Sequence, residues 1–149
     1  MEKLTGHKKV KTAVFISGTG SNLKNLIKFS KTKRSPIIID LIISNKKTEG
    51  LKYARQYKIG KAVIRYENIK IAEKKILSIL KKKKIEFICL AGFMKVLSAN
   101  FIKKFKGKII NIHPSYLPKY KGLNTSVRAL RNNEKFSGCT VHYVSSKLD

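Results

Sequence analysis

The chain has 149 residues, of which 42% are hydrophobic, and it carries a formal net charge of +26. This length and composition are typical of one globular domain and exclude global disorder. The longest aliphatic run, residues 37–43, contains Asp40 and is much shorter than the about 20 apolar residues that a membrane helix needs. The apolar run at residues 13–16 is too short for a secretory signal, so we expect a cytoplasmic protein without membrane partners.

Apolar runs of strand length alternate with amphipathic runs of helix length along the chain. We expect strands at residues 13–17, 37–44, 61–65, 87–91, 108–112 and 138–144, and helices at residues 21–31, 51–57, 69–83, 99–105 and 125–132. This alternation predicts an α/β fold with a mostly parallel central sheet. We expect residues 1–12 to form a basic N-terminal tail and residues 13–149 to form a single domain.

The first candidate site is the loop that joins the first strand to the first helix. It contains Gly18, Thr19, Gly20, Ser21 and Asn22. Amides at a helix N-terminus carry partial positive charge, and glycines allow a close approach of the backbone to a ligand. The loop therefore predicts a phosphate site, with a capped tight turn as the alternative. It lacks the third glycine of a dinucleotide fingerprint and the lysine of a Walker loop.

The second candidate site is an apolar loop after the fourth strand. Gly92 begins it, and Phe93, Met94, Lys95, Val96 and Leu97 follow. Ligands of such sheets bind beyond the carboxyl ends of the strands, where a loop this apolar is atypical. It predicts a slot for a flat heteroaromatic ligand, with a loop that caps the core as the alternative.

The third candidate site follows the fifth strand. Asn111 and His113 are two residues apart, so they share one face at the carboxyl end of the strand, and Pro114 and Pro118 stiffen the chain that leaves it. A carboxamide can donate a hydrogen bond to an oxyanion and an imidazole can carry a proton near neutral pH. No nucleophile is placed beside His113, so the pair predicts acyl transfer by direct attack of a substrate amine.

The two cysteines, Cys89 and Cys139, are 50 residues apart and each lies in an apolar run. Neither belongs to a Cys-x-x-Cys motif, so we expect two reduced core residues and no metal site. Of the 34 basic residues only five are arginine, and 19 residues are isoleucine. Lysine and isoleucine share A/T-rich codons, so compositional drift explains the charge without a specific nucleic-acid partner. A nonspecific nucleic-acid-binding module is the non-enzymatic alternative.

Four blocks of the sequence together resemble the folate-dependent formyltransferase family. They are residues 16–22, residues 90–94, residues 111–115 with 117–123, and residues 138–144 with Leu148 and Asp149. The blocks span nearly the whole chain, and the Ser-Gly-x-Gly-Ser-Asn loop favours the glycinamide ribonucleotide branch of the family. Methionyl-tRNA formyltransferase and formyltetrahydrofolate deformylase are the alternatives within it.

The resemblance implies a Rossmann-like three-layer fold with helices on both faces of the sheet. It also implies an enzyme that transfers a formyl group from 10-formyltetrahydrofolate, a co-substrate, to the amine of glycinamide ribonucleotide in de novo purine biosynthesis. No metal is implied, and the expected assembly is a monomer or a homodimer.

The resemblance also assigns roles to individual residues. Asn111 would hydrogen-bond the oxyanion, His113 would stabilise that charge or carry a proton, and Asp149 would hold His113 charged and relay protons through water. The loop from Gly18 to Asn22 would bind the substrate phosphate, and the apolar loop of residues 93–97 would line the folate pocket. His142 would support the site, with a packed core histidine as the alternative.

The chain departs from the family pattern at two positions and at its end. Lys95 and Asn124 stand where an arginine and a histidine are expected. Family members continue by roughly another third of a typical domain's length, so the C-terminal part of the family fold is expected to be absent here. We therefore expect the 149-residue chain to fold and bind phosphate but to be nearly inactive.

Overall fold

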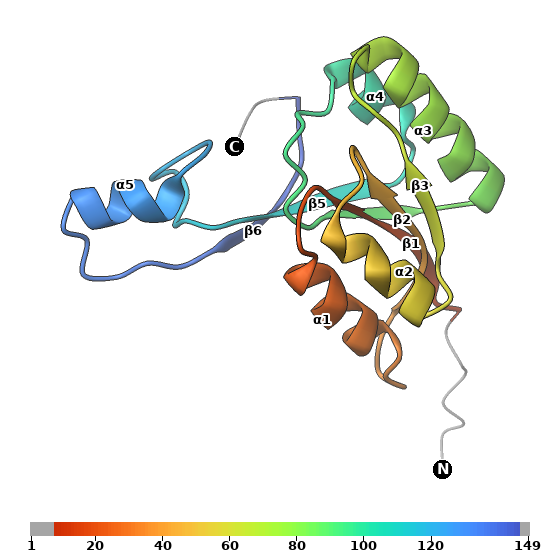
Figure 1. Ribbon diagram of the computed structural model, residues 1–149, viewed down its shortest axis with the longest axis horizontal. Coiled ribbons are helices and arrows are strands. Elements are labelled where there is room, and N and C mark those ends of the chain that lie inside the picture. Colours follow the sequence, from red (N-terminus) through yellow and green to blue (C-terminus); the bar gives the residue numbers. More distant parts are fainter. Residues whose placement is uncertain (1–7, 147–149) are drawn as a thin grey trace.

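The computed structural model describes residues 8–146, and its centre is one six-stranded sheet (Figure 1). The strands are β1 (Val10–Ile16), β2 (Ile37–Ser44), β3 (Gly60–Val63), β4 (Phe87–Leu90), β5 (Lys108–His113) and β6 (Thr140–Tyr143). Their order across the sheet is β3-β2-β1-β4-β5-β6. Neighbours among the first five strands are parallel, and β6 is antiparallel to β5. The predicted mostly parallel sheet is confirmed.

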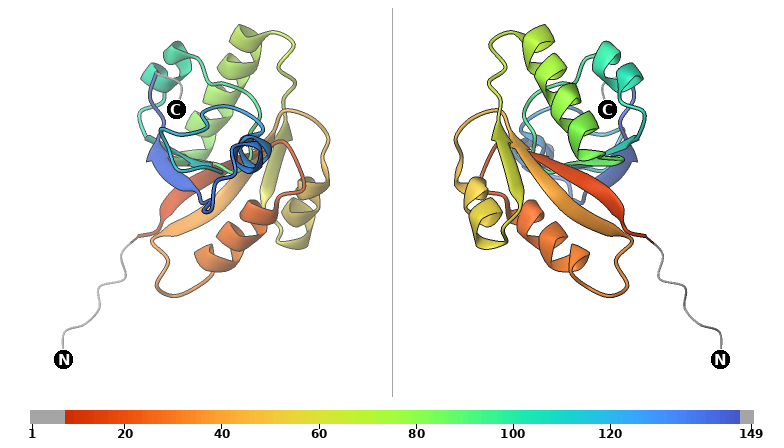
Figure 2. Two further views of the ribbon diagram at one scale, coloured as in Figure 1. Left: turned by 90° about the vertical axis from the view of Figure 1, so that its left-hand side faces the viewer. Right: turned by 90° about the vertical axis from the view of Figure 1, so that its right-hand side faces the viewer.

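Helices cover both faces of this sheet, as Figure 2 shows. The described helices are α1 (Ser21–Ser30), the 3-10 turn η1 (Glu49–Leu51), α2 (Lys52–Gln56), α3 (Ile69–Lys83), α4 (Ala99–Lys104) and α5 (Thr125–Arg131). The helices α1 and α2 lie on one face, and α3 and α4 lie on the other. The three-layer α/β architecture is therefore confirmed.

Alternate side chains of β1 supply the two halves of the core. Val14 and Ile16 pack with Leu23 and Ile27 of α1, and all four side chains are fully buried. Ala13 and Phe15 point to the opposite face, where they join a cluster that contains Ile76, Leu80 and Phe101. Because β1 is buried on both faces, its sequence is a continuous apolar run rather than an alternating one.

The sheet begins earlier than the sequence indicates. Residues 10–12 belong to β1 and not to the expected basic tail, since Val10 and Thr12 pair with Ile37 and Ile39 of β2. The polar start of the strand hides it from a hydrophobicity pattern, although Thr12 is fully buried and donates a 3.1 Å hydrogen bond to the Val10 carbonyl. The rest of the predicted tail, residues 1–7, lies outside the described residues.

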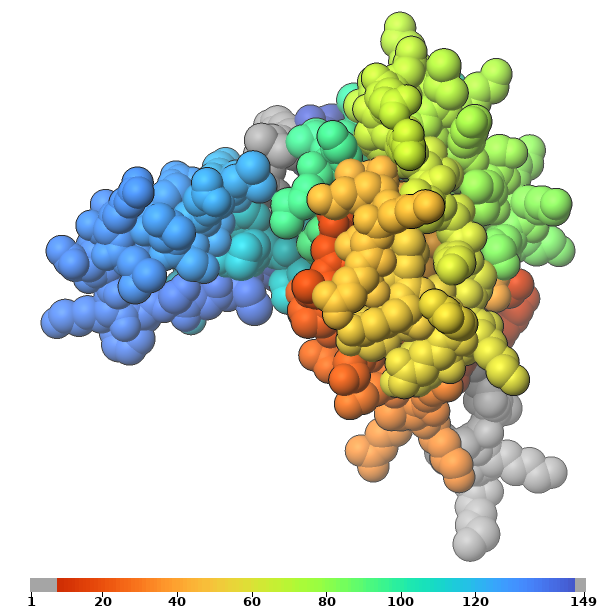
Figure 3. All heavy atoms as spheres, viewed as in Figure 1, coloured from red at the N-terminus to blue at the C-terminus, as the bar shows by residue number. Residues whose placement is uncertain are grey.

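Residues 114–139 form an arm that carries α5 and projects sideways from the sheet (Figure 3). Several large apolar side chains of the arm are exposed: Tyr116, Leu123, Val127, Leu130 and Phe136. Two more, Val141 and Tyr143, are exposed on the adjoining edge strand β6. Within residues 8–146, no helix combines the length and apolar character needed to cross a membrane.

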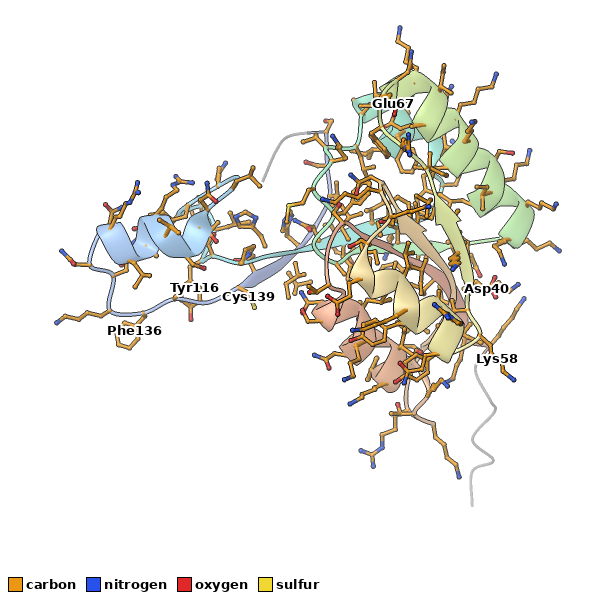
Figure 4. All side chains as sticks on the ribbon, viewed as in Figure 1. Asp40, Lys58, Glu67, Tyr116, Phe136 and Cys139 are labelled. Carbon is orange, nitrogen blue, oxygen red and sulfur yellow. The ribbon has the colours of Figure 1, made fainter. Side chains whose placement is uncertain are left out.

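The two cysteines have different surroundings. Cys89 is buried in β4, and burial raises the pKa of its thiol to about 11, so the thiol stays neutral near pH 7. Cys139 is exposed where the arm joins β6 (Figure 4), so its prediction as a core residue is wrong. The apolar residues that follow Cys139 belong to β6, which is an edge strand of the sheet. The outward side chains of β6 face solvent, because no second layer within residues 8–146 covers them.

Candidate functional site

The three segments singled out in the sequence leave three neighbouring strands at one edge of the sheet. β1 pairs with β4, and β4 pairs with β5. All three are parallel, so the loops after Ile16, Leu90 and His113 start from the same edge. Along the chain, β2 and β3 are added on one side of β1, and the next strand, β4, is added on the other side. Doubly wound sheets bind ligands at such a switch point, here between β1 and β4.

The loop after β1 leads directly into α1. Gly20 has a φ of +78°, and the helix starts at the next residue. The Gly18 carbonyl accepts hydrogen bonds from the Thr48 hydroxyl at 2.7 Å and from the Gly50 amide at 3.1 Å. Gly18, Thr19, Ser21 and Asn22 are exposed and Gly20 is buried. An exposed helix start of this kind suits an anion, and phosphate binding stays a prediction.

Gly18→Ala should weaken phosphate binding without destabilising the fold. An added Cβ would meet no atom within 4 Å, so the free energy of unfolding should change by less than about 0.5 kcal/mol. The same methyl group would project into the space that a bound phosphate needs. The dissociation constant for inorganic phosphate should therefore rise about tenfold, or about 1.4 kcal/mol, in a calorimetric titration.

Gly50→Ala is the matched comparison for this experiment. Its Cβ would lie 2.8 Å from both the Gly18 carbonyl oxygen and Ile16 Cδ1. This variant should lose about 1–3 kcal/mol of unfolding free energy, measured with urea. Undiminished phosphate affinity in Gly18→Ala would contradict a phosphate site at this loop.

The apolar loop after β4 is fixed on the core by two of its side chains. The Phe93 ring contacts the rings of Phe15 and Tyr66 edge-to-face, with centroids 5.3 Å and 5.6 Å apart. Leu97 is buried in the same core cluster. The exposed side chains of the loop are Met94, Lys95 and Val96, so these three can contact a ligand directly.

Asn111 lies opposite His142 in the antiparallel pairing of β5 and β6. The Asn111 Nδ2 atom is 3.3 Å from His142 Nε2, and His142 Nδ1 is 3.1 Å from the Tyr143 carbonyl oxygen. A carbonyl only accepts, so this geometry corresponds to a ring that donates from Nδ1 and accepts from the amide at Nε2. His142 is partly exposed, so the alternative of a packed core histidine is wrong.

His113 is the last residue of β5 and shares a face of that strand with Asn111. Its Nε2 atom is 3.0 Å from the Tyr120 carbonyl oxygen, so Nε2 donates in this contact. The ring is buried. The chain returns over the ring because the Ser115 hydroxyl donates to the Lys119 carbonyl at 2.7 Å.

The third residue of the expected catalytic trio, Asp149, lies outside the described residues. Within residues 8–146, no group of three or more His, Cys, Asp or Glu side chains could hold a metal ion. A cavity of about 250 Å³ lies between α5 and the segment that covers His113, with Ser115, Tyr120 and Glu134 in its lining. A second cavity, of about 560 Å³, lies where β3 ends and α3 begins, with Arg65 and Asn68 in its lining.

Two further polar residues, Ser17 and Asn45, lie at the same edge of the sheet. Ser17 belongs to the sequence block of residues 16–22, whereas no sequence pattern indicates Asn45. Ser17 follows β1 directly and Asn45 follows β2 directly, and the two side chains form a 2.6 Å hydrogen bond. The signal that could have found Asn45 is its position immediately after a buried parallel strand, where polar side chains gather near ligands.

Comparison with known proteins places these residues in a family. The model of the formyl transferase family matches residues 10–149. The chain is 41% identical over 143 residues to the protein named phosphoribosylglycinamide formyltransferase of Haemophilus influenzae, covering 93% of this chain and 68% of that protein. It is 43% identical over 155 residues to the human trifunctional purine biosynthetic protein adenosine-3, covering 98% of this chain and 15% of that protein.

Solved structures agree with the sequence relatives. The phosphoribosylglycinamide formyltransferase of Anaplasma phagocytophilum is similar with a TM-score of 0.87 and 40% identity, over 95% of this chain and 68% of that one. The glycinamide ribonucleotide transformylase 1 of Symbiobacterium toebii is similar with a TM-score of 0.90 and 30% identity, over 99% of this chain and 72% of that one. The chain spans only 11–15% of the length of the trifunctional relatives that it matches.

The match thus covers nearly all of this chain and only part of each relative. The matched region includes the three loops that follow β1, β4 and β5. On this evidence the chain belongs to the formyl transferase family.

Proposed function

We propose that this chain carries the proposed catalytic residues of an enzyme that formylates the amine of glycinamide ribonucleotide with 10-formyltetrahydrofolate, in de novo purine biosynthesis. One observation carries the proposal. The phosphate loop, the apolar loop and the segment after Asn111 and His113 all leave the sheet at the carboxyl ends of neighbouring parallel strands. The names of the Haemophilus influenzae and human relatives support the same reaction and pathway.

The proposed reaction is a direct transfer without an acyl-enzyme. The substrate amine attacks the formyl carbon, a new carbon–nitrogen bond forms, and the bond from that carbon to N10 of the folate breaks. The amine loses a proton and N10 gains one, so no oxidant or reductant is needed. The transition state resembles a tetrahedral oxyanion, and positioned hydrogen-bond donors stabilise such an oxyanion more than the planar formyl group.

Asn111 is the proposed donor to that oxyanion, because its Nδ2 amide is a neutral donor at the carboxyl end of β5. His113 is the proposed group that stabilises the charge or carries the proton, with its orientation held by the Tyr120 carbonyl. Asp149 completes the proposed trio by keeping the His113 imidazole charged, since a nearby carboxylate favours the protonated ring. His142 supports Asn111 through the 3.3 Å contact.

The substrates are proposed to lie on either side of this pair. The phosphate of glycinamide ribonucleotide would bind the amides of residues 18–22, and the folate would lie along Met94, Lys95 and Val96. Lys95 and Asn124 replace the expected arginine and histidine, so the contacts to the folate and to the substrate glycine differ from the family pattern. The predicted cytoplasmic location, and a monomer or homodimer without nucleic-acid partners, remain part of the proposal.

A formyl-transfer assay tests the proposal directly. The 149-residue chain and a version extended by the unmatched remainder of the Haemophilus influenzae relative would be incubated with formyl-labelled donor and glycinamide ribonucleotide. We expect transfer to the amine by the extended chain and much slower transfer by the chain as it stands. Transfer to initiator tRNA instead, hydrolysis of the donor without transfer, or no reaction by the extended chain would each overturn the proposal.

A further inference from the structure

The side chain of Ser17 joins three segments that are far apart in the sequence. Its hydroxyl donates a 2.6 Å hydrogen bond to Asn45 Oδ1 and accepts a 2.8 Å hydrogen bond from the Met94 amide. Its own backbone amide donates to the Gly92 carbonyl at 3.1 Å. Ser17 is 4% exposed, so water competes little for these contacts.

The direction of these hydrogen bonds shows that Asn45 contributes to the contact between Ser17 and Met94. A serine hydroxyl has one proton and two lone pairs. Because the Asn45 carbonyl oxygen takes the proton, a lone pair of the Ser17 oxygen is left to face the Met94 amide. An acceptor at position 45 therefore sets the orientation in which Ser17 can hold the apolar loop.

The other end of the apolar loop is held independently of Ser17. The buried Glu73 carboxylate accepts hydrogen bonds from the Ser98 amide at 2.8 Å and from the Ser98 hydroxyl. Ser98 in turn caps α4 by accepting from the Phe101 amide at 3.1 Å. Removing the Ser17 hydroxyl should thus release the Met94 end of the loop while the Ser98 end stays in place.

The backbone of Ser17 also begins the phosphate loop. The carbonyl of the next residue, Gly18, is held by Thr48 and Gly50. Ser17 is therefore joined by the chain to the start of the predicted phosphate site, and its side chain holds the start of the predicted folate site. The separation between these two loops would determine whether an amine and a formyl group come within reach of each other.

We propose that Ser17, oriented by Asn45, is a positioning residue that sets the phosphate loop and the folate loop at one fixed separation. The role of this contact in catalysis rests on the proposed function. The contact between Ser17 and the apolar loop itself does not depend on any ligand. We expect that loss of the Ser17 hydroxyl reduces the protection of the Met94 amide in the apolar loop. We also expect that a ligand at one site then has less effect on the affinity of the other site.

Amide hydrogen exchange in the ligand-free chain tests the structural part. Exchange at Met94 should be about five to ten times faster in Ser17→Ala and in Asn45→Ala, as expected for the loss of one ordinary hydrogen bond. Asn45→Asp keeps an acceptor and should restore protection. Ser35→Ala is the matched control, since Ser35 is equally buried and its hydroxyl bonds the Ile37 carbonyl outside the site. Unchanged Met94 exchange in both Ser17→Ala and Asn45→Ala would overturn the proposal.

Paired titrations test the functional part. The dissociation constant of ribose 5-phosphate would be measured with and without saturating folic acid, for the wild-type chain and for Asn45→Ala. In the wild type, folic acid should tighten ribose 5-phosphate binding by about fivefold or more. The factor should fall close to one in Asn45→Ala and return in Asn45→Asp.

The outcomes separate this inference from the proposed function. Wild-type binding of both probes without mutual effect would overturn the positioning role and leave the proposed function in place. Absence of binding by either probe would count against the proposed function, while the exchange measurement would still decide the role of Ser17 in the loop.

Discussion

His113→Ala should slow formyl transfer by about 10²–10⁴-fold, the usual contribution of a positioned general acid or base. The imidazole is the proposed group that stabilises or carries a proton in the transition state, and alanine removes it entirely. Michaelis constants should change much less than kcat, since the phosphate and folate loops do not depend on the ring. The measurement is a steady-state assay on whichever form transfers formyl, the 149-residue chain or the extended one.

The partner variant Asn111→Ala should cost about 10²–10³-fold in kcat, because it removes one donor to the oxyanion. Asn132→Ala is a matched control, since Asn132 donates to the Tyr120 hydroxyl at 3.1 Å and belongs to the arm. Equal losses in Asn111→Ala and Asn132→Ala would indicate an indirect structural effect. Full activity in His113→Ala would remove the residue from the mechanism.

Phe15→Ala should reduce the free energy of unfolding by about 3–5 kcal/mol, the range for a buried phenylalanine truncated to alanine. Phe15 lies in the central strand β1, is 0% exposed, and contacts the Phe93 ring. Domains are stable by only about 5–15 kcal/mol, so this single change would remove much of the total. Urea unfolding followed by circular dichroism measures it.

Phe136→Ala is the control for this stability measurement, because the same side chain is 81% exposed on the arm. Its effect should stay within about 0.5 kcal/mol. A loss below about 1 kcal/mol in Phe15→Ala would mean that β1 is not the centre of the core. The loss at Phe15 should also loosen Phe93 and the apolar loop that begins beside it.

Most element boundaries could be predicted from local patterns. The apolar run of β2 at Ile37–Ser44 and the amphipathic spacing of α3 at Ile69–Lys83 match their predicted ranges. These signals are local because burial on two faces requires a continuous apolar run, and burial on one side of a helix requires a 3.6-residue period. The same reasoning identified the three candidate loops, since each follows an apolar strand.

The errors come from positions where the environment is set by distant residues. The start of β1 carries Lys11 and Thr12 among its pairing residues, and its membership of the sheet depends on β2. Cys139 lies in an apolar sequence, and it is exposed because the arm carries no second layer there. His113 is buried because residues 115–120 return over it, which no periodicity indicates.

The sequence by itself determined the α/β class, the strands and helices, and the residue types of the candidate site. Only the tertiary structure decided the strand order, which makes β1, β4 and β5 neighbours and brings their loops to one edge. It also decided that Asn111 faces His142 and that Ser17 bridges Asn45 and Met94. The physical reason is that patterns of burial report on one element at a time, whereas strand pairing joins residues as far apart in the sequence as Thr12 and Phe87.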